Sequence, residues 1–245
     1  MEFRDFLHTL RVWDGQLPPF DPGTAPHTPL PLFQTWLTHA AGAGQPEPHT
    51  MSLATVDPQG HPDVRTLMLH DADEQGWHFA SHSTSTKGRQ LAAHPAAALG
   101  FYWPAVGRQV RLRGLVTPAG QDASQADLHA RSTGALAAAL VGRMSEVLDS
   151  YGELEAASAS AWERAREEPG TPVPTWTRYV LEPTEVEFFQ GDAQRRHVRL
   201  RYRREATAGT ADTTETAGAA GPADITEAAG SAGSAGAWTR ELLWP

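Results

Sequence analysis

The chain has 245 residues, 40% of them hydrophobic, so it can bury a core and falls in the range of a single domain with additions. A formal net charge of −9 disfavours nucleic acid as a partner, because surfaces that bind phosphate backbones carry an excess of Lys and Arg. The sequence contains no cysteine, which excludes disulfides, thiolate zinc sites and cysteine nucleophiles.

The N-terminus lacks the pattern of a secretory signal peptide, because Glu2 and Asp5 are acidic and no continuous apolar segment follows. The longest apolar run, residues 135–141, has seven residues, whereas a membrane span needs about 20. We therefore expect a cytoplasmic protein that has no membrane partner.

Residues 1–48 are expected to form an arm and a helix ahead of the main fold. Pro and Gly are frequent over residues 14–31, which favours an extended conformation, and the pattern of residues 32–41 predicts a helix. The Gly- and Pro-rich residues 42–48 end that helix.

A β-rich region follows over residues 49–204. Two strands at 51–56 and 63–70 predict a hairpin, because Asp57-Pro58-Gln59-Gly60 between them has the composition of a tight turn. The other elements expected before the helical segment are strands at 77–81, 97–103 and 109–117 and a short helix over 87–93.

An Ala-rich helical insertion is predicted over residues 121–168, with helices at 124–132, 134–144 and 153–167. Strand patterns then return at 179–181, 185–189 and 197–202. This order predicts an α+β, mainly β fold, a six- to seven-stranded barrel or strongly curled sheet with flanking helices.

The tract 205–237 consists almost entirely of Ala, Gly, Thr, Ser and acidic residues, so we expect it to be disordered. Residues 238–245 again alternate large apolar with polar side chains and predict a final strand. The tract is therefore expected to lengthen the loop between the last two strands, at little entropic cost.

Common catalytic and nucleotide-binding motifs are absent, including the Walker A loop, G-x-G-x-x-G after a strand, H-E-x-x-H and G-x-S-x-G. His78 and His82 are four residues apart, but on a strand that spacing separates them by about 13 Å. We therefore expect two ordinary strand histidines and no metal site.

Two basic clusters are candidates for binding an anion. If residues 195–202 form one strand, Arg195, His197, Arg199 and Arg201 share a cationic face. Arg65 and Lys87, with the hydroxyls of residues 83–86 at a helix start, make a plausible phosphate cradle. A solvated strand face and an ordinary helix cap explain the same patterns, so neither cluster alone names a ligand.

Taken in order, several segments resemble the pyridoxamine 5′-phosphate oxidase family over nearly the whole chain. The pieces are individually weak, and the ordered set is what makes the resemblance specific. The matching segments are LFQTWL at 32–37, ATVDPQGHP at 54–62, residues 65–70, GRQV at 107–110, EVEFFQG at 185–191, and the pattern Arg195-x-His197-x-Arg199.

The resemblance implies a split barrel that forms a homodimer, with flavin mononucleotide (FMN) bound at the subunit interface. Arg65 and Lys87 would hold the FMN phosphate, Gln109 would face the flavin ring, and Arg195 and His197 would lie over the substrate as the catalytic pair. The implied cofactor-binding set is Arg65, Thr66, Leu67, Met68, Leu69, His70, Ala80, Ser81, Thr86, Lys87, Gln109, Met144, Ser145, Phe189 and Arg199. The implied substrate-binding set is His70, Asp127, Arg131, Ala135, Arg195 and His197.

The chain departs from the family pattern around the substrate phosphate. The family usually has Lys, Tyr and Ser where this chain has His70, Asp127 and Ala135, and of the four contacts only Arg131 is kept. On the cofactor side, a basic residue, a tryptophan and a glutamine of the pattern are replaced by Thr86, Phe189 and Met144. Gaining a carboxylate beside a phosphate reverses the local electrostatics, although His70 would compensate in part if protonated.

Three functions follow from the resemblance and these departures. The first is an oxidase that forms pyridoxal 5′-phosphate from pyridoxamine or pyridoxine 5′-phosphate, with oxygen reoxidising the flavin. The second is a related FMN oxidoreductase acting on another substrate, as in phenazine biosynthesis, which the altered pocket favours. The third is an FMN-binding protein without turnover of its own.

Overall fold

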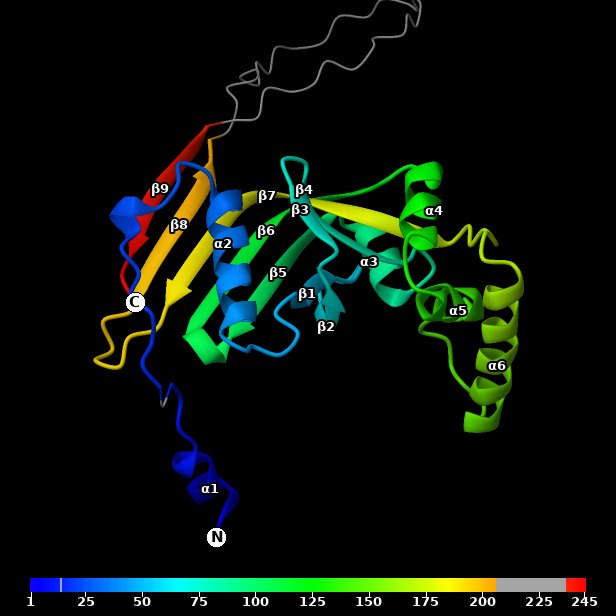
Figure 1. Cartoon of the computed structure of the whole chain (residues 1–245), viewed down its shortest axis with the longest axis horizontal. Coiled ribbons are helices and arrows are strands. Elements are labelled where there is room, and N and C mark those ends of the chain that lie inside the picture. The colour runs from blue at the N-terminus through cyan, green and yellow to red at the C-terminus, as the bar shows by residue number, and fades with distance from the viewer. Residues whose placement is uncertain (14, 206–236) are drawn as a thin grey trace, which may run out of the picture.

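The computed structural model describes residues 1–13, 15–205 and 237–245, and within them nine strands join in one antiparallel sheet (Figure 1). Seven strands lie on one path in the order β2-β1-β5-β6-β7-β4-β3, and β8 and β9 extend the sheet from β7. The strands are β1 (Thr50–Val56), β2 (Pro62–Met68), β3 (Asp71–Asp73), β4 (Gly76–His82), β5 (Ala96–Trp103), β6 (Arg108–Pro118), β7 (Trp176–Gln190), β8 (Val198–Arg204) and β9 (Trp238–Leu243).

Six α-helices flank the sheet among the described residues, so the expected mainly β fold with flanking helices is confirmed. In Figure 1, α2 crosses the sheet, α1 projects away from it, and α4, α5 and α6 gather at the end opposite β9. The helices are α1 (Phe3–Thr9), α2 (Pro29–Gly42), α3 (Thr86–Ala93), α4 (Gln121–His129), α5 (Thr133–Val141) and α6 (Tyr151–Glu167).

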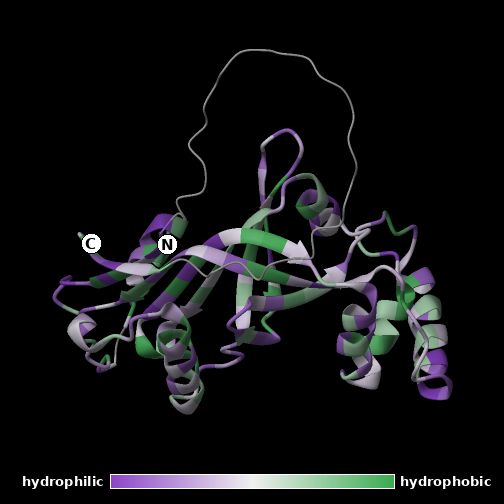
Figure 2. Cartoon of the chain, turned by 90° about the horizontal axis from the view of Figure 1, so that it is seen from above, coloured by the Kyte–Doolittle hydropathy of each residue, from purple (hydrophilic) through white to green (hydrophobic). Residues whose placement is uncertain are grey.

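The main core lies between α2 and one face of the sheet. Phe33 of α2 packs edge-on against Phe101 of β5, with ring centroids 5.0 Å apart, and Trp36 packs against Phe188 of β7 at 5.2 Å. Alternate residues of β5 and β6 are buried, and hydrophobic and hydrophilic residues accordingly alternate along strands (Figure 2). The opposite face of the sheet is left largely exposed.

The predicted hairpin at residues 51–70 is present, with β1 and β2 paired from Thr50↔Met68 to Val56↔Pro62. The Asp57 carboxylate accepts the backbone N–H groups of Gln59 and His61, which closes the turn.

The strands predicted at 179–181 and 185–189 are one continuous strand, β7, and this corrects the predicted break near Pro183. The chain accommodates the proline in a bulge, where the register shifts between Arg113 and Gly114 of β6. A Cβ on Gly114 would lie 1.9 Å from the Glu182 carbonyl oxygen, so the two backbones approach this closely only because residue 114 is glycine.

The helical insertion forms a layer with a small core of its own around Leu128, Leu136 and Trp176. Its three helices begin one to three residues before the predicted ones, which is within the usual uncertainty of helix ends. None of the helices in the described part of the chain is long and apolar enough to cross a bilayer.

Strands β8 and β9 pair antiparallel from Arg199↔Leu243 to Arg204↔Trp238. The Glu205 N–H also donates to the Ala237 carbonyl at 2.9 Å, so the two ends of the Ala/Gly-rich tract meet. The predicted disorder of that tract concerns residues that, apart from these ends, lie outside the described part of the chain.

Candidate functional site

The predicted phosphate cradle is centred on Lys87, in the first turn of α3. Lys87 is buried, its Nζ donates to Ser81 Oγ at 3.2 Å, and Met144 Sδ lies 3.5 Å away. Burial lowers the pKa of this lysine, and the positive charge of Arg65 lowers it further. No carboxylate forms an ion pair with Lys87 in the described part of the chain, although the more distant charge of Asp63 opposes the lowering of its pKa in part.

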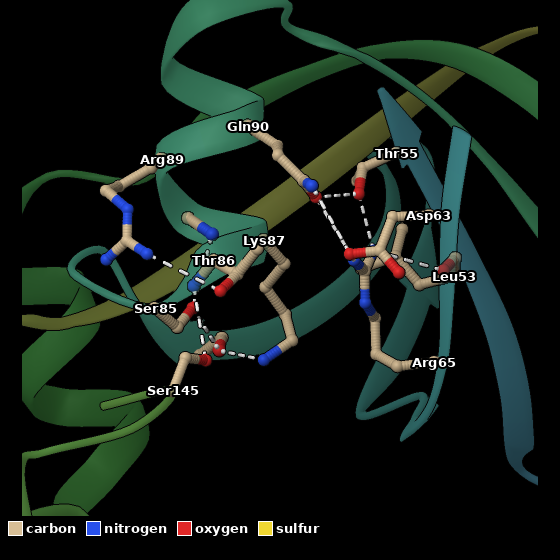
Figure 3. A network of polar contacts seen from close by, with 12 residues as sticks. Leu53, Thr55, Asp63, Arg65, Ser85, Thr86, Lys87, Arg89, Gln90 and Ser145 are labelled. Atoms are coloured by element: carbon tan, nitrogen blue, oxygen red, sulfur yellow. Dashed lines mark hydrogen bonds and ion pairs between the residues drawn. The ribbon is translucent and has the colours of Figure 1, made fainter. Parts of the chain in front are cut away.

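Arg65 of β2 lies at the other side of this cradle, held by a polar network (Figure 3). Its Nη1 donates to Thr55 Oγ1 at 2.5 Å, and its Nη2 donates to Asp63 Oδ2 at 2.5 Å and to Gln90 Oε1 at 3.1 Å. The guanidinium is therefore fixed in place, and Asp63 neutralises part of its charge.

The segment after α5 closes the cradle from the helical layer. Ser145 Oγ accepts the backbone N–H of Thr86 at 3.3 Å, at the exposed first turn of α3. Ser145 has a positive φ of 72°, which is uncommon outside glycine and marks a constrained turn. The structure thus brings together Arg65, Ser81, Thr86, Lys87, Met144 and Ser145 from four separate segments.

A second group lies in a row across the exposed face of the sheet. Gln109 of β6 pairs with Phe189 of β7, and Phe189 pairs with Arg199 of β8, so all three point to one side. Arg111, Glu187 and Pro245 complete the lining of a shallow hollow around this row. Three residues of the predicted cofactor set are therefore adjacent.

The cationic face predicted for residues 195–201 is not realised, which corrects the sequence interpretation. Glu187 is nearly buried, and its two oxygens accept from Arg199 Nε at 2.8 Å and from Arg111 Nε at 3.0 Å. Burial would raise the pKa of Glu187, but the hydrogen bonds from these two arginines hold it below its usual range. Arg201 pairs in the same way with Glu241 at 2.5 Å, so carboxylates from neighbouring strands neutralise the row.

Arg195 and His197 do not belong to the strand, which begins at Val198, and this corrects their predicted shared strand face. They lie in the loop between β7 and β8, where Arg195 is exposed and has a φ of 65°. The His197 ring packs against Phe189, with centroids 5.1 Å apart, so the loop places this histidine beside the row on the sheet.

A third group joins three of the predicted substrate residues. Arg131 Nε and Nη2 donate to the two carboxylate oxygens of Asp127, each at 3.0 Å, and Arg131 Nη1 donates to His70 Nε2 at 2.5 Å. Trp176 Nε1 also donates to Asp127 at 3.0 Å, and the Arg131 guanidinium lies 5.1 Å from the Trp176 ring centroid.

Charge in this third group is balanced within the protein. Burial would raise the pKa of Asp127, but hydrogen bonds from Arg131 and Trp176 hold it below its ordinary value. Burial and the adjacent Arg131 lower the pKa of His70 to about 4. His70 therefore adds little positive charge at neutral pH, and Asp127 offsets the charge of Arg131.

The other predicted site residues are placed by the hairpin and the helical layer. Thr66, Leu67 and Met68 lie at the end of β2, Leu69 follows it, and Ala80 lies on β4 next to Ser81. Ala135 lies in the first turn of α5, where its N–H is capped by Ser132 Oγ at 3.2 Å. Among the described residues, no hydrogen bond links Ala135 to Asp127 or His70.

His78 and His82 both lie on β4, as expected, and each has its own partner. His78 contacts Asp73 at 2.8 Å, and His82 contacts Thr175 at 2.8 Å. Within the described ranges no three His, Asp or Glu side chains are close enough together to hold a metal ion.

Sequence reasoning missed several residues that shape these groups, among them Asp63, Gln90, Trp176 and Trp13. Asp63 and Gln90 were detectable, since Asp63 is two residues from Arg65 on the same strand face and Gln90 lies one helical turn beyond Lys87. No local sequence pattern points to Trp176 or Trp13, because only the tertiary fold brings Trp176 to Asp127 and the Trp13 ring within 5.4 Å of the His197 ring.

Comparisons with known proteins identify the family of the chain. A family model described as pyridoxamine 5′-phosphate oxidase matches residues 37–165, and one described as the pyridoxine 5′-phosphate oxidase C-terminal dimerisation region matches residues 176–245. The chain belongs to the pyridoxamine 5′-phosphate oxidase family. The resemblance stated from sequence motifs is thereby confirmed.

Curated members of the pyridoxamine 5′-phosphate oxidase family match most of the chain. A protein of Burkholderia lata named pyridoxine/pyridoxamine 5′-phosphate oxidase is 40% identical over 186 residues, which cover 76% of this chain and 86% of the relative. A protein of the same name from Thermosynechococcus vestitus is 42% identical over 182 residues, covering 74% and 85%.

Solved structures show the same fold. PhzG from Burkholderia lata, solved in complex with tetrahydrophenazine-1-carboxylic acid, superposes with a TM-score of 0.74 at 26% identity and covers 94% of this chain and 100% of that one. A pyridoxamine 5′-phosphate oxidase-related, FMN-binding protein from Nostoc punctiforme has a TM-score of 0.59 at 22% identity and covers 87% and 97%.

Proposed function

We propose that the protein is an FMN-dependent oxidase that converts pyridoxamine or pyridoxine 5′-phosphate into pyridoxal 5′-phosphate, with oxygen as electron acceptor. The observation that carries the proposal is the burial of the Lys87 ammonium, which donates to Ser81 and lies close enough to Arg65 for the two positive charges to repel each other. Membership of the family and the names of its curated relatives support the assignment.

The cradle fits the phosphate of FMN. A dianionic group between Lys87 and Arg65 would relieve the repulsion of the two cations and would accept from the Ser81 and Ser145 hydroxyls as well. Bound FMN would supply the redox chemistry, taking two electrons from the substrate and passing them to oxygen. The protein's task is to hold the cofactor, orient the substrate and exclude water.

A second copy of the chain is needed to complete this site. Arg65 pairs with Leu53, and Leu53 pairs with Leu99, so Arg65 shares the core face of the sheet. Gln109 pairs with Tyr102 on the opposite, exposed face. Because one chain presents the cradle and the Gln109 row on opposite faces, we propose a homodimer in which each flavin lies between the cradle of one subunit and the row of the other.

The name of the C-terminal family model, a dimerisation region, supports this homodimer, since residues 176–245 contain Phe189 and Arg199. Exposed apolar side chains on the open face also favour a partner there, among them Tyr102 at 51% and Leu115 at 58% exposure. A monomer by analytical ultracentrifugation that still binds FMN tightly would contradict the arrangement.

Arg195 and His197 are the side chains that would orient the substrate at the flavin. Both lie in the loop that follows Phe189, and Arg195 is exposed there. Arg131 would contribute the remaining contact to the far end of the substrate. This assignment predicts that flavin bleaches when the protein is mixed anaerobically with pyridoxamine 5′-phosphate and recovers when air is admitted.

A second candidate function is favoured by the charge balance around Arg131. Because Asp127 takes two donors of Arg131 and His70 is neutral, the pocket offers no net positive charge for a phosphate. PhzG was solved in complex with tetrahydrophenazine-1-carboxylic acid, whose acidic group is a carboxylate. A related FMN oxidoreductase of the phenazine-biosynthesis type, acting on a substrate without phosphate, is therefore the alternative.

The same anaerobic experiment separates these functions. Bleaching by pyridoxamine 5′-phosphate at micromolar concentration supports the vitamin B6 oxidase, whereas bleaching only by a reduced phenazine carboxylate supports the alternative. Tight FMN binding without bleaching by either would identify a non-catalytic FMN-binding protein.

A further inference from the structure

The loop between β7 and β8 is built around Asp192. Its side-chain Oδ1 accepts the N–H groups of Gln194 at 2.7 Å and Arg196 at 3.2 Å, and its carbonyl accepts the N–H of Arg195 at 2.9 Å. The backbone N–H of Asp192 itself donates to Nδ1 of His197 at 3.0 Å. The His197 ring is thus tied to the base of a tight turn.

That last hydrogen bond determines which nitrogen of His197 carries the proton. A backbone N–H can only donate, so Nδ1 must be the acceptor, and a neutral imidazole then has its proton on Nε2. Nε2 has no hydrogen-bond partner among the described residues. His197 consequently presents Nε2–H as a donor, and the lone pair on Nδ1 already accepts the Asp192 N–H.

Trp13 holds the ring in this orientation from the N-terminal arm. The indole contacts the His197 ring edge-on, with centroids 5.4 Å apart and planes at 74°, and Phe189 supports the ring from the sheet at 5.1 Å. Trp13 itself has a φ of 56°, so the arm bends sharply to place the indole there. Trp13 lies outside both segments matched by the family models.

The close packing of the Trp13 indole against the backbone depends on Gly191. A Cβ on Gly191 would lie 3.1 Å from two ring carbons of Trp13 and 3.1 Å from the Gly107 carbonyl oxygen. The Gly191 N–H donates to that same carbonyl at 2.7 Å, so the backbone has little room to retreat. A Cβ at residue 191 would therefore push the indole by a few tenths of an ångström relative to His197.

We propose that Trp13 is a positioning residue that holds His197 as an Nε2–H donor toward an electron-rich atom of the substrate. His197 then orients the substrate by donating a hydrogen bond and does not act as the base that removes a substrate proton. This inference rests on the proposed function, which places the substrate beside Phe189 and His197.

The tautomer is tested directly by 15N chemical shifts of the imidazole nitrogens in the FMN-loaded dimer, with His197→Gln used to assign the signals. We expect Nε2 to be protonated and Nδ1 to be the unprotonated acceptor. A spectrum with the proton on Nδ1 would overturn the inference. If the purified protein lacked FMN, the proposed function would fail, but the tautomer would still be measured in the flavin-free protein.

Steady-state kinetics test the roles of both residues. His197→Ala should lose about ten-fold in kcat/KM, mainly through KM, and His197→Gln, which keeps an amide N–H donor near the position of Nε2, should recover part of that loss. If His197 were the base, both variants would lose kcat equally and the acidic limb of the pH profile would disappear. That outcome would refute the donor role while leaving FMN binding intact.

Trp13→Phe should behave like the unaltered protein, because it keeps the edge contact and removes an indole N–H that is buried without a partner among the described residues. Trp13→Ala and Gly191→Ala should each change the His197 15N signals and raise KM, by about three- to ten-fold. Phe6→Ala, in the exposed helix of the same arm, is the matched control. If Trp13→Ala matched Phe6→Ala in both signals and KM, Trp13 would have no positioning role.

Discussion

Asp127 and Arg131 form a two-pronged ion pair in which Nε and Nη2 of the arginine each lie 3.0 Å from a carboxylate oxygen. Both side chains are about 15% exposed, so solvent screens the pair only weakly. The arginine expected to hold the substrate phosphate is thereby neutralised within the protein.

Changing Asp127 to Asn should release Arg131 and improve the binding of phosphorylated substrates. Removing one opposing charge is worth about 1–3 kcal/mol, so KM for pyridoxamine 5′-phosphate should fall by about five- to 150-fold with little change in kcat. Adding His70→Lys and Ala135→Ser should extend the effect. The control is Asp127→Asn with Arg131→Gln, which should lose the gain. A low micromolar KM in the unaltered protein, with no improvement in Asp127→Asn, would show that the ion pair does not limit phosphate binding.

Changing Arg65 and Lys87 together to Ala should strip the protein of FMN. Hydrogen bonds between charged groups contribute about 1.5–3 kcal/mol each, so the dissociation constant should rise by about a hundred-fold or more. Flavin absorbance of the purified protein and fluorescence titration with FMN measure this. Arg89→Ala is the control, since Arg89 lies on the same helix and its side-chain hydrogen bonds within the described residues go to Thr84 and Thr86. Full FMN content in the double variant would place the cofactor elsewhere.

Stability should fall as the pH drops from about 6.5 toward 4. The folded pKa of His70 is about 4, below its unfolded value of 6.5, so between these values the unfolded state binds more protons and is favoured by acid. His70 faces Arg131, Asp127 and His49. The pKa of Asp127 is lowered below 3.8, so its contribution to folding stability is lost only below the pH range in which His70 titrates.

Urea unfolding at several pH values, with His70→Gln as the comparison, measures this dependence. The variant should show a flatter profile between pH 6.5 and 4.5, because it has no group that titrates there at residue 70. Parallel profiles for the two proteins would mean that His70 keeps an ordinary pKa when folded.

Deleting residues 207–236 and joining the ends with a short turn should leave the thermal midpoint and the FMN content nearly unchanged. Ile225 is the one large apolar residue in the sequence of the tract, too little to add to a core, and the two ends already meet where Glu205 N–H donates to the Ala237 carbonyl. Differential scanning calorimetry of the shortened dimer provides the measurement. A large fall in the midpoint would reveal that the tract packs against the fold.

The sequence by itself determined the features that depend on local periodicity and turn chemistry. The hairpin over residues 50–68 follows from alternation and the Asp57 turn, and the cradle residues Ser81 and Lys87 follow from a strand that runs into a capped helix. Motif order was sufficient for the family, because the matched segments keep their spacing along nearly the whole chain.

Only the tertiary structure decided the charge of each group. Arg199 looked like part of a free cationic face, but Glu187, which neutralises it, lies on the neighbouring strand, and cross-strand partners are set by register rather than by local sequence. The protonation of His70 depends likewise on Arg131, 61 residues away along the chain. Electrostatic energies depend on the distance and burial of both partners, and folding alone determines which side chains become neighbours.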